Sequence, residues 1–295
     1  PGVMHACGHD IHAAWAVGAA ALLARAPADR DVLVVLQPGE ETGRGALGII
    51  ASGALDDAQA IFGAHVDMRF PLGQVVADAG PLAASSDTFT IALHGRGAHA
   101  ARPHESDDPV VAIAALVVAL QSIVARRVNP AAPAVLTVGT LRAGTAPNVI
   151  PDHATLGGTL RATDAPTRAL LLEQLHAVAR GIADAHRVEA RITIDEGTPP
   201  VVNAAVPTAW ARRAVGALLG HDALVPLGFA NMAAEDFAHY QERLPGCFLR
   251  IGAAHVGERP IAAHSPRFAP AEESLFVGAA VLAACAREAA RALGG

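Results

Sequence analysis

Two short apolar runs constrain this chain most: DVLVVLQ at residues 31–37 and AIFGAHV at residues 60–66. Each run is too short for a buried helix. Each also lacks polar alternation, which is typical of a strand covered on both faces of a parallel sheet. Helical patterns at 9–25 and 44–54 alternate with these runs. Alternating helices and buried strands predict an α/β domain.

The pattern of the sequence changes near Pro81. DTFTIALHG at 87–95 alternates apolar and polar residues, as a strand with one exposed face does. The elements from here onward follow the order β-α-β-β-α-β, which describes a two-layer sandwich with an antiparallel sheet. After the strand at 87–95 we expect a helix at 107–127, strands at 133–142 and 153–162, a helix at 165–186 and a strand at 187–195.

The last third of the chain returns to the first pattern. We expect a helix capped by Asn203 and running to about Leu219, a strand at 223–227, a helix at 234–243, a strand at 247–252 and a helix at 271–293. The simplest architecture is one α/β domain, residues 1–82 and 198–295, interrupted by an inserted α+β domain, residues 83–197. The length of 295 residues also favours two domains, because single domains commonly have about 150.

Composition excludes several classes of function. The sequence contains no lysine, which removes Schiff-base chemistry, Ser-Lys hydrolysis and the phosphate-loop lysine. A net charge of −6 and 4% aromatic residues give no basic or stacking surface for nucleic acid or for an anionic membrane. The three cysteines are widely spaced and form no CxxC motif, so we expect a reducing compartment, the cytoplasm.

One uncharged stretch, residues 109–125, approaches the length of a membrane span. It is rich in alanine, follows two aspartates and precedes two arginines, which suits the dipole of a soluble helix. We therefore expect a buried or half-buried helix rather than a span. No signal peptide is visible. The chain opens at Pro1 and is at once dense in Cys and His, so we expect it to lack the start of a longer protein.

Candidate metal ligands lie far apart along the chain. In an extended segment Cys7 and His9 would point the same way and could reach one metal ion, although a buried Cys beside an ordinary His is also open. His65 closes an apolar run, where a core histidine is the alternative, and His264 alone would be a surface residue. Together with Glu41 they offer one thiolate, one carboxylate and three imidazoles, a mix that suits Zn²⁺ and other first-row divalent ions.

Glu40 and Glu41 follow the breaker Pro38-Gly39 after the run at 31–37. Ligands bind at the carboxyl ends of strands in open α/β sheets. One carboxylate could bind a metal ion while its neighbour acts as a general base. The alternative is a solvated helix start, where acidic residues are favoured.

Other positions are candidates with plain alternatives. His99 and His104 lie in GRGAHAARPH, Asn148 lies in TAPNVIP and Arg161 lies near the end of a predicted strand. Taken alone, these residues are explained more simply by loop polarity, turn chemistry and a solvated strand end. The Glu235-Asp236 pair in MAAEDF is interpreted as the acidic start of a helix.

As an ordered set, the motifs are specific. MHACGHDIH, QPGEETGRGA, FGAHVD, ASSDTFTIALHGRGAHAARPH, GTAPNVIP, GGTLRA, AAEDF and HSPRF span essentially the whole chain. The set resembles the metal-dependent amidohydrolases of the aminoacylase/carboxypeptidase superfamily, in the branch of hippurate hydrolases and auxin–amino acid conjugate hydrolases. The resemblance implies an α/β/α catalytic domain interrupted by an inserted ferredoxin-like α+β domain that acts as lid and dimerisation domain. The active protein would therefore be a homodimer.

The resemblance also implies roles for single residues. Glu40 would be the general base and His99 would stabilise the oxyanion, commonly in the partner subunit's active site. Asn148 and Arg161 would contact substrate. Two divalent ions, of a type that the sequence leaves open among Zn, Mn, Co and Ni, would share the Cys7 thiolate. Their ligands would be Cys7, His9, Glu41, His65 and His264.

The implied reaction is hydrolysis of the amide bond of an N-acyl amino acid or a similar small conjugate. Alternatives are a peptidase or deacetylase for another small amide, a catalytically silent binding relative, and a structural zinc protein. Two departures from the family pattern stand out. A segment that normally precedes PGVMHACGHD is absent, and Ala233-Ala234 replaces two glycines before EDF, which we expect to change packing rather than chemistry.

Overall fold

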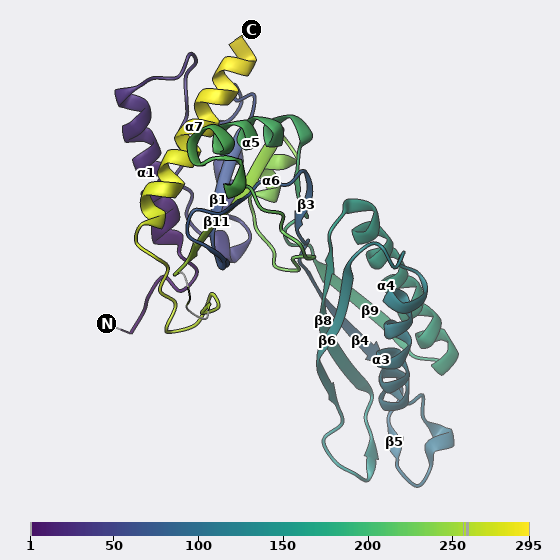
Figure 1. Cartoon of the computed structure of the whole chain (residues 1–295). Helices are drawn as coiled ribbons and strands as arrows, with labels where there is room; N and C mark the ends of the chain where they lie inside the picture. The colour runs from purple at the N-terminus through teal and green to yellow at the C-terminus, as the bar shows by residue number, and fades with distance from the viewer. Residues whose placement is uncertain (1, 256, 258–259, 295) are drawn as a thin grey trace. The chain divides into compact units, whose positions relative to one another are not determined.

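The computed structural model describes residues 2–255, 257 and 260–294. These residues divide into two compact units, which are described separately (Figure 1). The first unit comprises 1–82, 201–229 and 236–295, and the second comprises 83–200 and 230–235. Residues 230–235 thus group with the second unit, a detail that no composition shift in the sequence indicates.

The first unit is built on a small sheet covered by helices. β1 (Ile61–Pro71) runs parallel to β11 (Gly246–Ala254), and β11 also pairs antiparallel with β2 (Val75–Val76). All of β11 is buried, as expected for a strand covered on both faces. α1 (His9–Arg25) and α7 (Ser274–Gly294) lie side by side, α5 (Ala205–Leu219) packs on α7, and β3 (Gly80–Ala83) pairs with β10 (Val201–Asn203) (Figure 1).

The prediction of a buried strand at 31–37 is wrong. Residues 31–39 form no strand, and Leu33 and Leu36 are 58% and 57% exposed. An apolar run becomes a buried strand only when a neighbouring strand completes its hydrogen-bond ladder. No strand of the described residues pairs with this segment.

Three smaller expectations in the last third are also wrong. Asn203 lies in β10 and does not cap α5. Its side-chain amide instead bonds both backbone groups of Phe248, at 2.7 and 2.8 Å. The strand expected at 223–227 is reduced to one bridge between Leu224 and Val75 after a 3₁₀ turn, η3 (His221–Ala223). The helix expected at 234–243 is only α6 (Ala238–Gln241).

The second unit has the expected ferredoxin-like arrangement. Its antiparallel sheet has the order β6-β8-β4-β9, and two helices cover one face (Figure 1). Both helices begin at aspartate caps, Asp108 and Asp164, which accept hydrogen bonds from backbone amides of the first turn. The elements are β4 (Asp87–His94), α3 (Pro109–Arg126), β6 (Ala134–Ala143), β8 (His153–Ala162), α4 (Ala165–His186) and β9 (Glu189–Asp195).

Short elements lie next to the loops that carry several of the candidate residues. In the first unit these are a 3₁₀ turn, η1 (Glu40–Thr42), and α2 (Gly45–Ala51). In the second unit β5 (Ala98–His99) pairs with β7 (Val149–Ile150), and η2 (Pro103–Glu105) follows β5.

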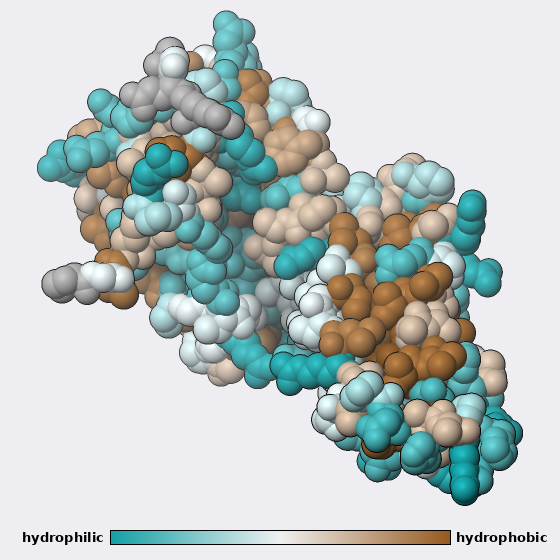
Figure 2. Space-filling model, turned by 90° about the horizontal axis from the view of Figure 1, so that it is seen from below, coloured by the Kyte–Doolittle hydropathy of each residue, from teal (hydrophilic) through white to brown (hydrophobic). Residues whose placement is uncertain are grey.

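α3 is long and apolar enough by composition to cross a membrane. One face of the helix, which includes Ile113, Leu116 and Leu120, is fully buried in the core of the second unit. This agrees with the expected core helix. The exposed side of the helix carries Val111 and Val118, which are 54% and 72% exposed, as well as the polar Gln121 and Ser122. Figure 2 shows hydrophobic residues gathered on one side of this unit.

Candidate active site

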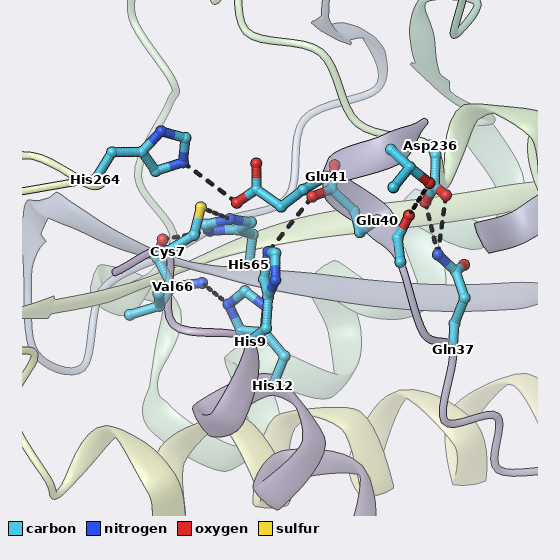
Figure 3. Close-up of polar contacts among 12 residues, drawn as sticks. Cys7, His9, His12, Gln37, Glu40, Glu41, His65, Val66, Asp236 and His264 are labelled. Carbon is cyan, nitrogen blue, oxygen red and sulfur yellow. Dashed lines mark hydrogen bonds and ion pairs between the residues drawn. The ribbon is translucent and has the colours of Figure 1, made fainter. Parts of the chain in front are cut away.

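Four segments of the first unit bring metal-binding atoms together (Figure 3). They are the turn before α1 with the first residue of that helix, the loop that contains η1, strand β1 and the loop before α7. Among the side chains of these four segments, three groups form, and the ligand atoms of each lie within 4.8 Å of one another. The groups are Cys7–His9–His65, Cys7–Glu41–His264 and His9–Glu40–Glu41. The five side chains expected as ligands therefore converge, together with Glu40.

Glycine and an unusual backbone conformation shape the approach of these segments. Gly8 precedes α1 with φ of 86°, and a Cβ atom there would lie 2.6 Å from Val66 Cγ1, so only glycine fits. The His264 amide donates to the Ala6 carbonyl at 2.7 Å, which joins the late loop to the turn that carries Cys7. His264 itself has φ of 66°, a left-handed conformation that is uncommon outside glycine.

The loop of η1 turns its two acidic side chains toward different partners. Gly39 and Gly43 flank the 3₁₀ turn, both with left-handed backbone angles. Glu40 Oε2 lies 3.4 Å from His9 Nε2, while Glu41 Oε1 lies 3.4 Å from His264 Nε2. Adjacent carboxylates thus face separate imidazoles, which allows them separate roles.

His65 is held in the tautomer that a metal ligand needs. Its Nδ1 donates to the Val66 carbonyl at 2.7 Å, so the lone pair of Nε2 faces Cys7 Sγ at 3.4 Å. Burial, with a smaller effect of Arg250, lowers the pKa of His65 to about 3. The imidazole is therefore neutral at pH 7, as metal coordination requires.

A metal ion would satisfy the ligand atoms of this cluster better than they satisfy one another by hydrogen bonds. Among the residues that the structure describes, His9 Nε2 is buried and has no hydrogen-bond partner, although the Glu40 carboxylate lies 3.4 Å away. A buried polar atom in that state is costly unless a further partner completes it. Imidazole nitrogen, thiolate sulfur and carboxylate oxygen together are ligands typical of Zn²⁺ and similar ions.

Glu40 has an unusual proton affinity for a carboxyl group. Burial, together with the nearby carboxylates of Asp236 and Glu41, raises the pKa of Glu40 to about 7. A carboxylate with such a pKa can both accept and return a proton near neutral pH.

Comparison with known proteins assigns the family. The chain matches peptidase family M20/M25/M40 over residues 1–288. It belongs to that family. This confirms the resemblance found from the ordered motifs.

Relatives of this M20 chain include enzymes named for amide hydrolysis. It is 39% identical to N-acetyl-L-cysteine deacetylase of Bacillus subtilis over 85% of its own length, and 37% identical to IAA-amino acid hydrolase ILR1-like 4 of Arabidopsis thaliana over 97%. It spans 60% and 66% of those two proteins. A crystal structure of the Bacillus subtilis YxeP protein, described as a dinuclear metal binding peptidase from the M20 family, matches with a TM-score of 0.82 and 32% identity over 98% of this chain and 74% of that one.

The remaining predicted residues lie in the second unit of this M20 chain. His99 and Asn148 are exposed and are neighbours, because β5 pairs with the start of β7. The Ala101 amide donates to His99 Nδ1 at 3.1 Å, so a neutral His99 carries its proton on Nε2. Arg161 donates from Nη1 to the Met232 carbonyl at 3.1 Å, and His104 is exposed.

Three residues near the M20 donor cluster carry roles that the sequence did not indicate. His12 accepts the Val66 amide at 3.0 Å, and its ring lies 4.3 Å from that of His65. The spacing of three between His9 and His12 on a helix was the available signal. Gln37 and Asp236 bond each other beside Glu40. The interpretation of Asp236 as the start of its own helix is wrong, because α6 begins at Ala238 and the Asp236 carboxylate accepts the Ala46 amide of α2 instead.

The three cysteines should differ sharply in reactivity. Burial raises the pKa of the Cys247 thiol to about 11 and raises that of Cys285 further, whereas Cys7 is only half-buried. Because the thiolate is the nucleophile, we expect metal-free protein to react with an aromatic disulfide reagent at Cys7 alone. Saturating Zn²⁺ should suppress that reaction, and peptide mapping would identify the site. Rapid modification of Cys247 or Cys285 in folded protein would contradict this expectation.

Proposed function

We propose that this chain is the catalytic part of a metal-dependent amidohydrolase that acts on N-acyl amino acids or similar small amide conjugates. The observation that carries the proposal is the convergence of five metal-binding side chains with Glu40 in one cluster. The names of the relatives support the substrate class, because one names an N-acetyl amino acid and the other names IAA–amino acid conjugates. The expected location is the cytoplasm.

Cys7 belongs to two of the three ligand groups, which supports two ions that share its thiolate. His9 and His65 would complete one set, and Glu41 and His264 the other. The description of YxeP as a dinuclear metal binding protein agrees with two ions. Zn, Mn, Co and Ni all suit these ligands. When bound, such ions polarise the amide carbonyl and lower the pKa of water toward about 7.

Glu40 supplies the proton transfers. Its carboxylate takes a proton from the water that attacks the acyl carbonyl carbon. It then donates that proton to the leaving amine nitrogen as the C–N bond breaks. The products are a carboxylic acid and an amino acid. Asn148 and Arg161 are proposed to contact the substrate.

The test is a hydrolysis panel on the full chain loaded with Zn²⁺, Mn²⁺, Co²⁺ or Ni²⁺. It would compare N-acetyl, N-benzoyl and indole-acyl amino acids with dipeptides, N-acetyl diaminopimelate and a folate-type conjugate. Metal content would be measured on the same samples. We expect turnover of at least one N-acyl amino acid. Full metal loading without any hydrolysis would contradict the proposal and favour a catalytically silent binding relative.

His99 is proposed to donate from Nε2 to the developing oxyanion in the active site of a partner subunit. Loss of one oxyanion donor costs about 10²–10³-fold in kcat, so we expect His99→Ala to fall by that factor with little change in KM. His104→Ala is the matched control, since His104 is an exposed histidine of the same loop. A kcat for His99→Ala within about threefold of the parent would contradict this role. Mixing His99→Ala with a Glu40 variant should restore activity if the residues act across subunits.

A homodimer through the second unit is proposed, and the exposed apolar face of α3 supports it as the contact surface. We expect Val118→Asp to convert the dimer to monomer, because a buried unpaired charge at an interface is strongly unfavourable. Analytical ultracentrifugation measures the change. Phe276→Asp, at a 79% exposed position of α7, is the control. Val118→Asp protein that remains fully dimeric would place the interface elsewhere.

A further inference from the structure

The loop that carries Glu40 and Glu41 is closed at its base. Its two ends, Pro38 and Gly45, touch, since a Cβ atom on Gly45 would lie 2.1 Å from the Pro38 carbonyl oxygen. Glycine is therefore required there for the ends to meet. Between these ends the backbone turns twice through left-handed glycines. The position of both acidic side chains thus depends on what holds the two ends together.

Asp236 is bonded to both ends of this loop. Its carboxylate accepts Gln37 Nε2 at 2.9 Å on each oxygen (Figure 3). Oδ2 also accepts the Ala46 amide at 3.0 Å. Gln37 immediately precedes the loop and Ala46 immediately follows it. Asp236 is 1% exposed and Ala46 is fully buried, so water does not compete for these bonds. Asp236 also reaches the loop itself, because its backbone amide bonds the Glu40 carboxylate.

A third residue fixes the orientation of Gln37. The Tyr240 hydroxyl donates to Gln37 Oε1 at 2.6 Å, and Tyr240 is itself buried. The amide oxygen of Gln37 is thereby occupied, and its NH₂ group must face Asp236. The network is therefore directional: tyrosine donates to glutamine, and glutamine donates to aspartate.

We propose that Asp236 is a positioning residue, which fastens both ends of the 38–45 loop and so sets where Glu40 and Glu41 stand relative to the histidines. The inference rests on the proposed function. Asp236 is not proposed to touch the reacting atoms. It acts through the loop, much as residues behind metal ligands orient those ligands.

Asp236→Asn tests the proposal with little change in size. Asparagine has one acceptor oxygen, and bonding it to the Ala46 amide turns the Asn NH₂ group against the Gln37 NH₂ group. We expect kcat to fall about 10–100-fold, and Zn²⁺ affinity, measured by competition with a chromophoric chelator, to fall by a similar factor. KM should change little, because the loop positions acids rather than substrate.

The double variant Gln37→Glu/Asp236→Asn separates positioning from general destabilisation. In it the Asn NH₂ group donates to the carboxylate introduced at position 37, which still accepts the Tyr240 hydroxyl, so the closure is rebuilt with donor and acceptor exchanged. Gln37→Glu alone sets two carboxylates against each other and should be as impaired as Asp236→Asn. We expect the double variant to recover kcat and Zn²⁺ affinity to within about threefold of the parent.

Asp78→Asn is the matched control, because the Asp78 carboxylate accepts the Leu227 amide at 2.8 Å in the same unit but belongs to none of the ligand groups. It should leave kcat and Zn²⁺ affinity unchanged. Two results would overturn the proposal: Asp236→Asn protein with parental kcat and Zn²⁺ affinity, or a double variant no better than the single ones. If the unsubstituted chain hydrolyses no amide, the proposed function fails, while Zn²⁺ affinities across the same variants still decide this inference.

Discussion

Glu40→Gln protein should retain its metal ions and lose about 10²–10⁴-fold in kcat, the range of a general acid–base contribution. Glutamine keeps the size of the side chain and an oxygen that can accept the Asp236 amide. It cannot take a proton from water at neutral pH. Because Glu40 is not among the five proposed ligands, the metal content after dialysis should match that of the parent.

Two comparisons sharpen this expectation. Glu41→Gln should lose metal as well as activity, since Glu41 belongs to a ligand group with Cys7 and His264. Glu242→Gln alters a mostly exposed carboxylate on the same unit and should change neither quantity. Single-turnover kinetics would show whether the chemical step itself slows. A Glu40→Gln variant with kcat within about threefold of the parent would end the assignment of Glu40 as the base.

Removal of metal should abolish hydrolysis and lower thermal stability together. Ligand donors that converge without satisfying one another are stabilised when an ion joins them, as the buried His9 Nε2 illustrates. At a free Zn²⁺ concentration about 100 times Kd, binding stabilises a folded protein by about 2.7 kcal/mol. Calorimetry before and after chelation would record a fall in Tm, and re-addition of Zn²⁺ should restore both Tm and turnover.

Cys7 is the ligand whose loss should matter most, because it is shared by two groups. Cys7→Ala should therefore weaken metal binding more than His264→Ala, which disturbs one group. Elemental analysis after dialysis measures the stoichiometry of each variant. Cys247→Ala is the control, since Cys247 lies in the core of the first unit. Equal retention of metal by Cys7→Ala and the parent would refute a shared thiolate.

Where local pattern decides, the sequence predicted the fold well. In the second unit the alternation along β4 and the aspartate caps of α3 and α4 are local signals, and the observed elements follow them. The prediction of a strand at 31–37 was wrong because a buried strand needs a neighbouring strand, which the apolar run itself does not specify. The prediction that Asn203 caps a helix was wrong for a similar reason. Its side chain bonds the backbone amide and carbonyl of Phe248 in β11 instead of the helix start.

In the candidate site, too, some residues could be predicted from the sequence and others depend on contacts that only the fold creates. Cys7, His9, Glu41, His65 and His264 could be selected from the sequence because their atom types are rare in combination and suit one kind of ion. Gln37 and Asp236 lie in two of the motifs, but the sequence does not pair them, because a glutamine and an aspartate have no distinctive chemistry until the fold sets them 2.9 Å apart. His12 is an intermediate case. Its spacing of three from His9 on a helix indicates that the two side chains are near each other, but it does not indicate the bond to the Val66 amide.

The left-handed backbone of His264 sets the stability of the fold against the proposed role of its imidazole in metal binding. A residue with a Cβ atom gives up about 1–2 kcal/mol in that conformation, and glycine would relax it. Glycine would also delete an imidazole that the proposed metal centre needs. A designer who optimised this chain for heat resistance alone would therefore be led to discard the side chain on which its proposed activity depends.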